Sequence, residues 1–195
     1  MQRLTLHRAR LIFDRRSLCA LCLLLILGGC GTLWQTAAPN VHTPHWSIDI
    51  PEKWMLLETS DYHMFSKDGP YLHYILVQSR PLERKYRHTN LKIDRAMLPH
   101  EAAQVVINDL RADPALRRLR IIDNAPVMID GSLGFKIDYV YEDPNGMDQQ
   151  THFYGVVTPP FLFTLRYTAA KRHYFERYID DFTRVLQSVR LQKNG

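Results

Sequence analysis

The hydrophobic pattern after residue 45 alternates with a period of two, which predicts a protein built mainly from β-strands. Trp46, Ile48 and Ile50 alternate with polar residues, and Pro51 ends this first run. Successive side chains of a strand point to opposite faces, so each such run has one apolar face. Further runs cover 62–66, 71–78, 118–123, 126–129, 132–141, 151–157 and 161–167. The pattern predicts about seven strands.

Tight turns separate several of these runs and predict antiparallel pairing. A glycine accepts the positive φ that short hairpin turns require. Such turns are indicated at Asp68-Gly69, Asp130-Gly131 and Asn145-Gly146, and Pro159-Pro160 breaks the chain before the last run. The run 71–78 is apolar at both parities, so we expect both of its faces to be covered.

Two segments follow the helical period instead. Residues 101–111 place Ala103, Val106, Ile107 and Leu110 on one stripe, and Pro114 prevents a continuation. Residues 171–188 carry a wider apolar face, which consists of Tyr174, Phe175, Tyr178, Ile179, Phe182, Val185 and Leu186, with Val189 just beyond. Because a helix this apolar needs a sheet to cover, the predicted fold class is α+β, an antiparallel sheet flanked by helices.

The first thirty residues predict an export signal. Five arginines and one aspartate precede an apolar run from Leu18 to Leu27. A basic segment followed by a short apolar core is typical of a secretory signal peptide, whereas a membrane span needs about 20 apolar residues. The run ends on Leu-Gly-Gly-Cys30, which resembles the bacterial lipobox. That resemblance implies that the Cys30 thiol receives a diacylglycerol and that Cys30 becomes the mature N-terminus.

These features give the expected organisation of the chain. We expect a signal peptide over 1–29, a lipidated tether over 30–44 that contains Pro39 and Pro44, and one domain over 45–195. An uncleaved interfacial anchor is the alternative. Arg15-Arg16 resembles a twin-arginine signal, so general and twin-arginine export both stay open. Gly31 follows the cysteine, and the lipobox resemblance then implies the inner leaflet of the outer membrane.

Charge and cysteine content exclude some functions once the signal is set aside. Most of the net charge of +5 comes from the arginines that precede the apolar run, so the exported part is close to neutral. The charge therefore gives no support for nucleic-acid binding. All three cysteines, Cys19, Cys22 and Cys30, lie in the signal or at the anchor. The domain consequently depends on its core rather than on disulfides.

Four stretches of the domain resemble the PsbP-type fold, which DcrB-like bacterial lipoproteins and a eukaryotic Ran-binding import factor share. They read IDIPEKWMLLE (48–58), FSKDGPYLHYILV (65–77), IDGSLGFKIDYVY (129–141) and YTAAKRHYFERYIDDFTRVLQSVRL (167–191). The resemblance implies an α/β/α sandwich and a binding or assembly role. No binding residue of the family maps onto a matching motif here, and residues 81–97 match nothing in it.

Candidate catalytic residues are absent from the sequence pattern. The domain has no cysteine, no G-x-S-x-G and no Ser-His pair by spacing, although an activated nucleophile needs a base beside it. We therefore expect a non-enzymatic protein with no cofactor. An unrecognised hydrolase stays open, because catalytic triads are assembled in space rather than in sequence.

The polar face of the predicted sheet is a candidate ligand site. Residues of both charges and a histidine share strand parity there, and we expect them to line a shallow pocket if their strands are neighbours. They are Asp49, Lys136, Asp138, His152, Tyr154 and Arg166.

A long basic loop is the candidate partner site. Long loops in compact domains are often functional. Its cations are Arg80, Arg84, Lys85, Arg87, Lys92 and Arg95, and Glu83 and Asp94 dilute them. We expect an envelope protein partner there, with the lipid anchor as the membrane contact, and lipid phosphates or a cell-wall polymer stay open as alternatives for the loop. His42-x-x-His45 is a weaker metal candidate, since its two rings need not converge across Pro44. A small-ligand or metal-binding lipoprotein is the alternative function.

Overall fold

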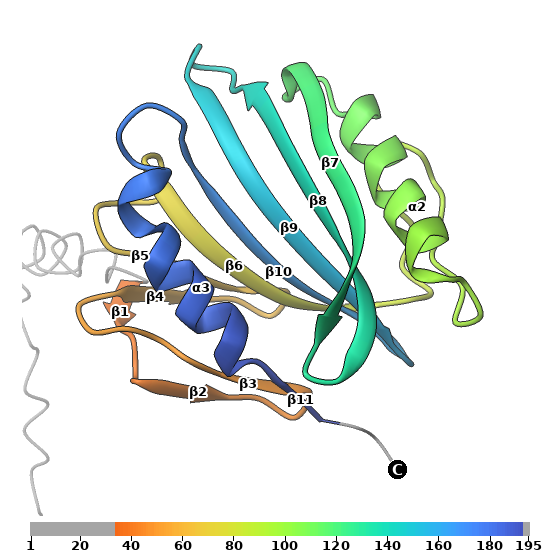
Figure 1. Cartoon of the computed structure of the whole chain (residues 1–195), viewed down its shortest axis with the longest axis horizontal. Helices are drawn as coiled ribbons and strands as arrows, with labels where there is room; N and C mark the ends of the chain where they lie inside the picture. Colours follow the sequence, from red (N-terminus) through yellow and green to blue (C-terminus); the bar gives the residue numbers. More distant parts are fainter. Residues whose placement is uncertain (1–33, 193–195) are drawn as a thin grey trace, which may run out of the picture. The chain divides into compact units, whose positions relative to one another are not determined.

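An antiparallel sheet of eight strands forms the middle layer of the fold (Figure 1). The structure is a computed structural model that describes residues 34–192. The strands are β1 (Trp34–Thr36), β2 (Asn40–His42), β3 (Trp46–Asp49), β4 (Met55–Glu58), β5 (His63–Ser66), β6 (His73–Pro81), β7 (Arg117–Ile129), β8 (Ser132–Glu142), β9 (Asp148–Thr158), β10 (Phe161–Ala170) and β11 (Arg190–Leu191). The helices are α2 (Pro99–Ala112), a short 3₁₀ helix η1 (Glu176–Tyr178) and α3 (Ile179–Ser188).

The strands pair antiparallel throughout. The large sheet has the order β1-β4-β5-β6-β10-β9-β8-β7, and a small sheet has the order β11-β3-β2. The predicted α+β class is confirmed, with one more strand in the large sheet than expected. The two β-runs at 118–123 and 126–129 form the single long strand β7, which bulges between Ile121 and Asp123.

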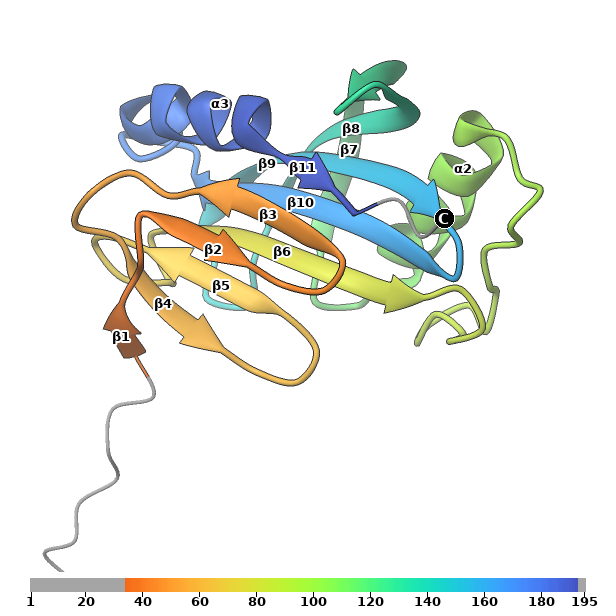
Figure 2. The same cartoon turned by 90° about the horizontal axis from the view of Figure 1, so that it is seen from below.

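Two separate cores lie on the two faces of the large sheet (Figure 2). Helix α3 and the small sheet pack on one face, against buried residues such as Ile75, Leu165 and Tyr167. Helix α2 packs on the other face, against residues such as Ile137 and Phe153. Strand β6 contributes to the middle of the sheet, and Ile75, Leu76 and Val77 are all buried, so the prediction that both of its faces are covered is confirmed.

The predicted turns join the predicted hairpins. Gly69 precedes β6 with φ of +107°, and Gly131 joins β7 to β8 with φ of +70°. A residue with a side chain would be strained in either conformation, which explains why glycine follows aspartate at both places. The β8–β9 and β9–β10 hairpins likewise turn at Asn145-Gly146 and Pro159-Pro160.

The first helix extends slightly beyond its predicted span, and the second begins later than predicted. Regular helix starts only at Glu176, and residues 171–175 form a turn in which the Phe175 N–H donates to the Ala170 carbonyl at 3.2 Å. His173 has φ of +77°, which lies outside the helical region and interrupts the predicted helix. The apolar face survives this change, because Phe175, Tyr178 and Phe182 are all buried.

The folded unit begins before His45. The segment for which a tether was expected contains β1, which pairs with β4, and β2, which pairs with β3. Val41 on β2 is buried in the core. These strands have only three residues each, too few for a period of two to stand out. The predicted signal peptide (1–29) and Cys30 lie outside the described residues. Within the described part, no helix is long and apolar enough to cross a membrane.

Candidate functional site

A polar cluster lies on the α3 face of the large sheet, where the sequence predicted a ligand site. Strand register sets Asp138 directly opposite His152, and Lys136 directly opposite Tyr154, across β8 and β9. Asp123 on β7 is the register partner of Asp138. Four of the six predicted ligand residues therefore meet, and the neighbouring strand β7 adds a carboxylate that the sequence pattern did not single out.

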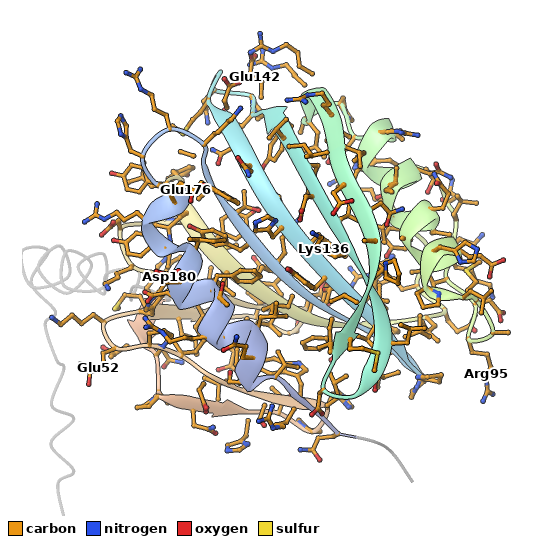
Figure 3. All side chains as sticks on the ribbon, viewed as in Figure 1. Glu52, Arg95, Lys136, Glu142, Glu176 and Asp180 are labelled. Carbon is orange, nitrogen blue, oxygen red and sulfur yellow. The ribbon has the colours of Figure 1, made fainter. Side chains whose placement is uncertain are left out.

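The charges of this cluster neutralise one another. His152 Nδ1 lies 2.5 Å from Asp138 Oδ1, and Lys136 Nζ lies 2.9 Å from Asp138 Oδ2. Lys136 Nζ also lies 3.0 Å from Asp123 Oδ2. Figure 3 shows Lys136 on the sheet face between α3 and β7. Because each charged group already has a partner, the cluster joins β7, β8 and β9 and presents no uncompensated charge to a ligand.

Burial and hydrogen bonding act in opposite directions on Asp138. Desolvation alone would raise the pKa of its carboxyl, since burial disfavours the charged form. Hydrogen bonds from His152 and Lys136 outweigh that effect and lower the pKa, so the carboxylate stays ionised. Hydrogen bonds to Asp138 and Asp123 raise the pKa of Lys136. Lys136 and Asp138 are therefore a mutually stabilised ion pair.

Aromatic rings on the α3 side partly cover the cluster and reduce its contact with water. The His152 ring lies 5.0 Å from that of Phe175 and 6.3 Å from that of Phe182, while Tyr154 lies 5.8 Å from Phe182. Phe182 comes from α3, so the helix covers part of the polar face. The expected open pocket is thus replaced by a partly covered ion network.

Two predicted members of this site lie elsewhere. Arg166 on β10 is the register partner of Phe153, so its side chain is on the α2 face, opposite to His152. The alternation of side chains along each strand was predicted correctly. The pairing of β10 with β9 differs by one residue from the pairing that the prediction assumed, and this difference puts Arg166 on the other face of the sheet. Asp49 lies on β3 of the small sheet, where its side chain accepts a hydrogen bond from Asn40 Nδ2 at 2.5 Å.

The basic loop between β6 and α2 divides into engaged and exposed cations. Arg84 pairs with Asp61 at 3.0 Å, and Lys92 pairs with Glu83 at 2.8 Å. Arg80 turns back onto the loop, where it donates to the Arg84 and Lys85 carbonyls at 2.8 and 2.6 Å. The remaining three cations are exposed and form no ion pair with any residue in 34–192; they are Lys85, Arg87 and Arg95.

Asp109 on α2 holds this loop in place, and the sequence pattern did not reveal its role. Its Oδ1 accepts hydrogen bonds from the His88 N–H at 2.9 Å, the Thr89 N–H at 3.0 Å and the Thr89 hydroxyl at 3.1 Å. An acidic residue on a helix usually faces water, and nothing in the local sequence distinguishes this one. The loop is consequently ordered by the helix that follows it.

The histidine pair at 42 and 45 does not form the core of a metal site. His45 packs on Phe161 with ring centroids 4.3 Å apart, and His42 is exposed on β2. Across residues 34–192 no group of three or more histidine, cysteine, aspartate or glutamate side chains is placed to hold a metal ion.

The arrangement of the sheet and helices matches solved structures, although the sequence alone matches little. No protein-family model and no curated protein matches the chain. The cyanobacterial PsbP (CyanoP) of Synechocystis sp. PCC 6803 matches it with a TM-score of 0.56 and 13% identity, over 86% of this chain and 99% of that chain. The chain has the PsbP-like fold.

Two further PsbP-like structures come from distant organisms. LpqN, involved in cell envelope biogenesis of Mycobacterium tuberculosis, matches with a TM-score of 0.54 and 16% identity, over 82% of this chain and 91% of that chain. The Ran-binding protein Mog1p of Saccharomyces cerevisiae matches with a TM-score of 0.51 and 8% identity, over 80% of this chain and 96% of that chain. The fold that the sequence resembled is confirmed, and at these identities the likeness concerns the fold alone.

Proposed function

We propose that this protein is a lipid-anchored binding module of the cell envelope, which docks a protein partner through the loop between β6 and α2 and catalyses no reaction. The observation that carries the proposal is the exposure of Lys85, Arg87 and Arg95 on an ordered loop without carboxylate partners among the described residues. Such cations favour an acidic surface and speed its encounter.

The order of the loop supports a docking role. Leu82 and Ile93 are buried, and the Tyr86 N–H donates to the Leu91 carbonyl at 2.7 Å. Asp109 fixes the middle of the loop, as described above. A loop that is already ordered loses less conformational entropy on binding, so more of its contact energy becomes affinity.

The position of the loop favours a protein partner over the anchoring membrane. Figures 1 and 2 show β1 and the loop side of α2 at opposite ends of the folded unit, and in Figure 3 Arg95 points away from the sheet. If Cys30 carries the lipid, β1 begins four residues later, so β1 is within about 14 Å of the anchor. The cations of the loop are then at the end of the folded unit that is remote from the attachment point of the tether.

The names of two fold neighbours agree with this class of function. LpqN is involved in cell envelope biogenesis and Mog1p is a Ran-binding protein, so one name agrees with an envelope location and the other with a protein partner. We infer the same general role for this chain, with the outer membrane facing the periplasm as its location.

The anchor is tested by mass spectrometry of the full-length gene product purified from membranes. We expect a diacylglycerol-modified Cys30 at the N-terminus, and we expect a Cys30→Ala variant to lose that mass and to leave the membrane fraction. An unmodified chain that starts at Met1 would contradict the anchor but not the docking loop.

The docking loop is tested by a photo-reactive residue at Arg87, placed in the full chain in living cells. We expect one defined protein adduct, and we expect it to fall about tenfold when Lys85 and Arg95 are both changed to glutamine, because surface steering depends on these charges. The matched control changes Arg120 and Arg172 to glutamine, two exposed cations outside the loop. An adduct that persists in the loop variant, or falls equally in the control, contradicts the proposal.

A further inference from the structure

A cleft of about 330 Å³ opens on the α2 face of the sheet, beside the helix and the ordered loop. Its floor is formed by Gln78, Thr164 and Arg166 of β6 and β10, and its walls include Val106, Leu110 and Tyr86. Its volume lies at the lower end of the range for small-molecule sites.

Arg166 is the unusual member of this cleft. Its Nε is buried and has no hydrogen-bond partner among the described residues. Its guanidinium forms no ion pair within residues 34–192, and the Tyr74 ring lies 5.5 Å from its Cζ. Arginine stays protonated in proteins. Burial alone would lower its pKa, but Tyr74, Tyr139 and Tyr141 lie near the guanidinium and raise the pKa, with a hydrogen bond from the guanidinium to Tyr139. Neutral phenols supply no counter-charge, and a buried charge without a counter-ion calls for an explanation.

The two acids that line the cleft are already committed to other groups. Asp109 accepts three hydrogen bonds from His88 and Thr89. Asp113 Oδ2 lies 3.6 Å from His88 Nε2. Neither carboxylate is within ion-pair distance of Arg166. Both hold loop residues in the wall of the cleft, and neither neutralises the charge of Arg166.

The rest of the lining indicates the shape and polarity of the missing partner. Strand register places Gln78 opposite Thr164, one pair further along the floor from Arg166, and these offer an amide and a hydroxyl. Leu76 and Phe153 flank Arg166 on the two neighbouring strands. Arg80 lies about 13 Å further along the sheet. Its guanidinium already donates hydrogen bonds to the carbonyls of Arg84 and Lys85. Arg166 on the floor and Arg87 on the loop both line the cleft without an ion pair among the described residues.

We propose that this cleft binds a small organic carboxylate, whose carboxylate pairs with the Arg166 guanidinium and whose apolar body packs against Phe153, Val106 and Leu110. A planar carboxylate matches the fork of donors on arginine, and such charge-assisted pairs are short and strong. Phosphate is the competing anion, since Arg87 also lines the cleft, but the planar donor fork of Arg166 beside apolar side chains favours a carboxylate that carries an apolar body. The site shares Arg87 with the docking loop proposed above, whereas Arg166 belongs to the cleft alone.

The test titrates the full chain in detergent with sodium benzoate, with neutral benzamide and with sodium phosphate, followed by nitrogen–proton NMR of the arginine side chains. We expect saturable binding of benzoate that shifts the Arg166 Nε–H signal. Benzamide, which has the same ring without the charge, is expected to bind at least about tenfold more weakly, since it loses a charge-assisted pair.

Two variants and a thermal melt keep the result interpretable. Arg166→Gln is expected to lose about tenfold or more in benzoate affinity while its melting temperature without ligand stays equal or rises, because an unpaired buried charge is removed. The control Arg120→Gln is expected to bind as the wild type does. A large fall in melting temperature of Arg166→Gln would assign the arginine a structural role and overturn the proposal. Failure to bind benzoate, or tighter binding of phosphate, would overturn the carboxylate class.

Discussion

The two faces of the large sheet carry similar residue types in opposite electrostatic states. On the α3 face, Asp123, Lys136, Asp138 and His152 form a continuous network in which each charge has a partner. On the α2 face, Arg166 is partly buried beside neutral tyrosines and has no carboxylate partner among the described residues. The first arrangement stabilises the sheet, whereas the second is expected to destabilise it until an anion arrives. The difference separates a structural polar cluster from a candidate binding site.

The two helices explain why the cleft beside Arg166 lies on the α2 face. Helix α3 and the turn before it bury large aromatic side chains, including Phe175, Tyr178 and Phe182. The buried residues of α2 are small or medium in size, namely Ala102, Ala103, Val105, Val106 and Ile107. Small side chains fill less of the space between a helix and a sheet. The loop between β6 and α2 therefore completes the layer on this face, and the cleft lies between α2 and that loop.

The largest expected effect tests whether the α3 face has the deeper core. Phe182→Ala removes an aromatic side chain that is 1% exposed, and we expect it to lower the free energy of unfolding by about 4 kcal/mol. Val106→Ala on the α2 face is the comparison, with an expected loss of about 2 kcal/mol because fewer buried atoms are removed. Urea denaturation of both variants measures the two losses. Equal losses would mean that the two faces are equally well packed.

The second prediction tests the charge network itself. Asp138→Ala leaves Lys136 and His152 without their shared acceptor, and we expect a loss of about 3 kcal/mol in the free energy of unfolding. Asp123→Ala removes the other partner of Lys136, but that carboxylate is 48% exposed, so we expect less than about 1 kcal/mol. Denaturation of both variants at one salt concentration makes the comparison. Similar losses would show that burial does not distinguish the two carboxylates.

The smallest expected effect is a pH dependence on the α3 face. His73 accepts a hydrogen bond from the Asp68 N–H at 3.1 Å and is packed 4.3 Å from the Tyr178 ring. Burial, chiefly, lowers the pKa of His73 from 6.5 to about 4. The unfolded chain therefore binds more protons between these values, and stability is present above pH 6.5 and is lost as the pH falls toward 4.

We expect this loss to be on the order of 2 to 3 kcal/mol, because one pK unit corresponds to about 1.4 kcal/mol. Unfolding curves at several pH values between neutrality and pH 4 measure the slope. His73→Gln is expected to flatten it. Val77→Ala, which is destabilised but retains His73, is the control and is expected to keep the slope of the wild type. A His73→Gln slope equal to that of the wild type would contradict the assignment.

The sequence predicted the hairpins and most of the large sheet because these depend on local patterns. Alternating apolar residues mark β8 and β9, and the glycines at 131 and 146 mark the turns on either side of β8. The short strands β1, β2 and β11 were missed, since two or three residues contain no readable period. Strand β4 was missed because its sequence, MLLE, does not alternate between apolar and polar residues. The start of the last helix was misplaced because the apolar pattern continues through a turn that His173 interrupts.

The candidate site was predicted in part, and the error has a single physical cause. Lys136, Asp138, His152 and Tyr154 come from one hairpin, whose Asn-Gly turn fixes their register, and the structure brings them together. Arg166 comes from the next hairpin, where the register at Pro159-Pro160 decides which face it occupies. A difference of one residue in that register moves every side chain of β10 to the other face. Asp109 was missed because its partners come from a separate loop.

The amino-acid sequence by itself determined the strand and helix content, the hairpin turns and the apolar faces, because these follow from the preferences of neighbouring residues. It also predicts the export signal and the lipidation of Cys30, on which the proposed anchor depends. Only the tertiary structure decided which charges meet and which are left alone. Burial, register across strands and the packing of α2 against a distant loop set the local dielectric and the available partners. Those conditions separate the compensated Asp138 from the uncompensated Arg166.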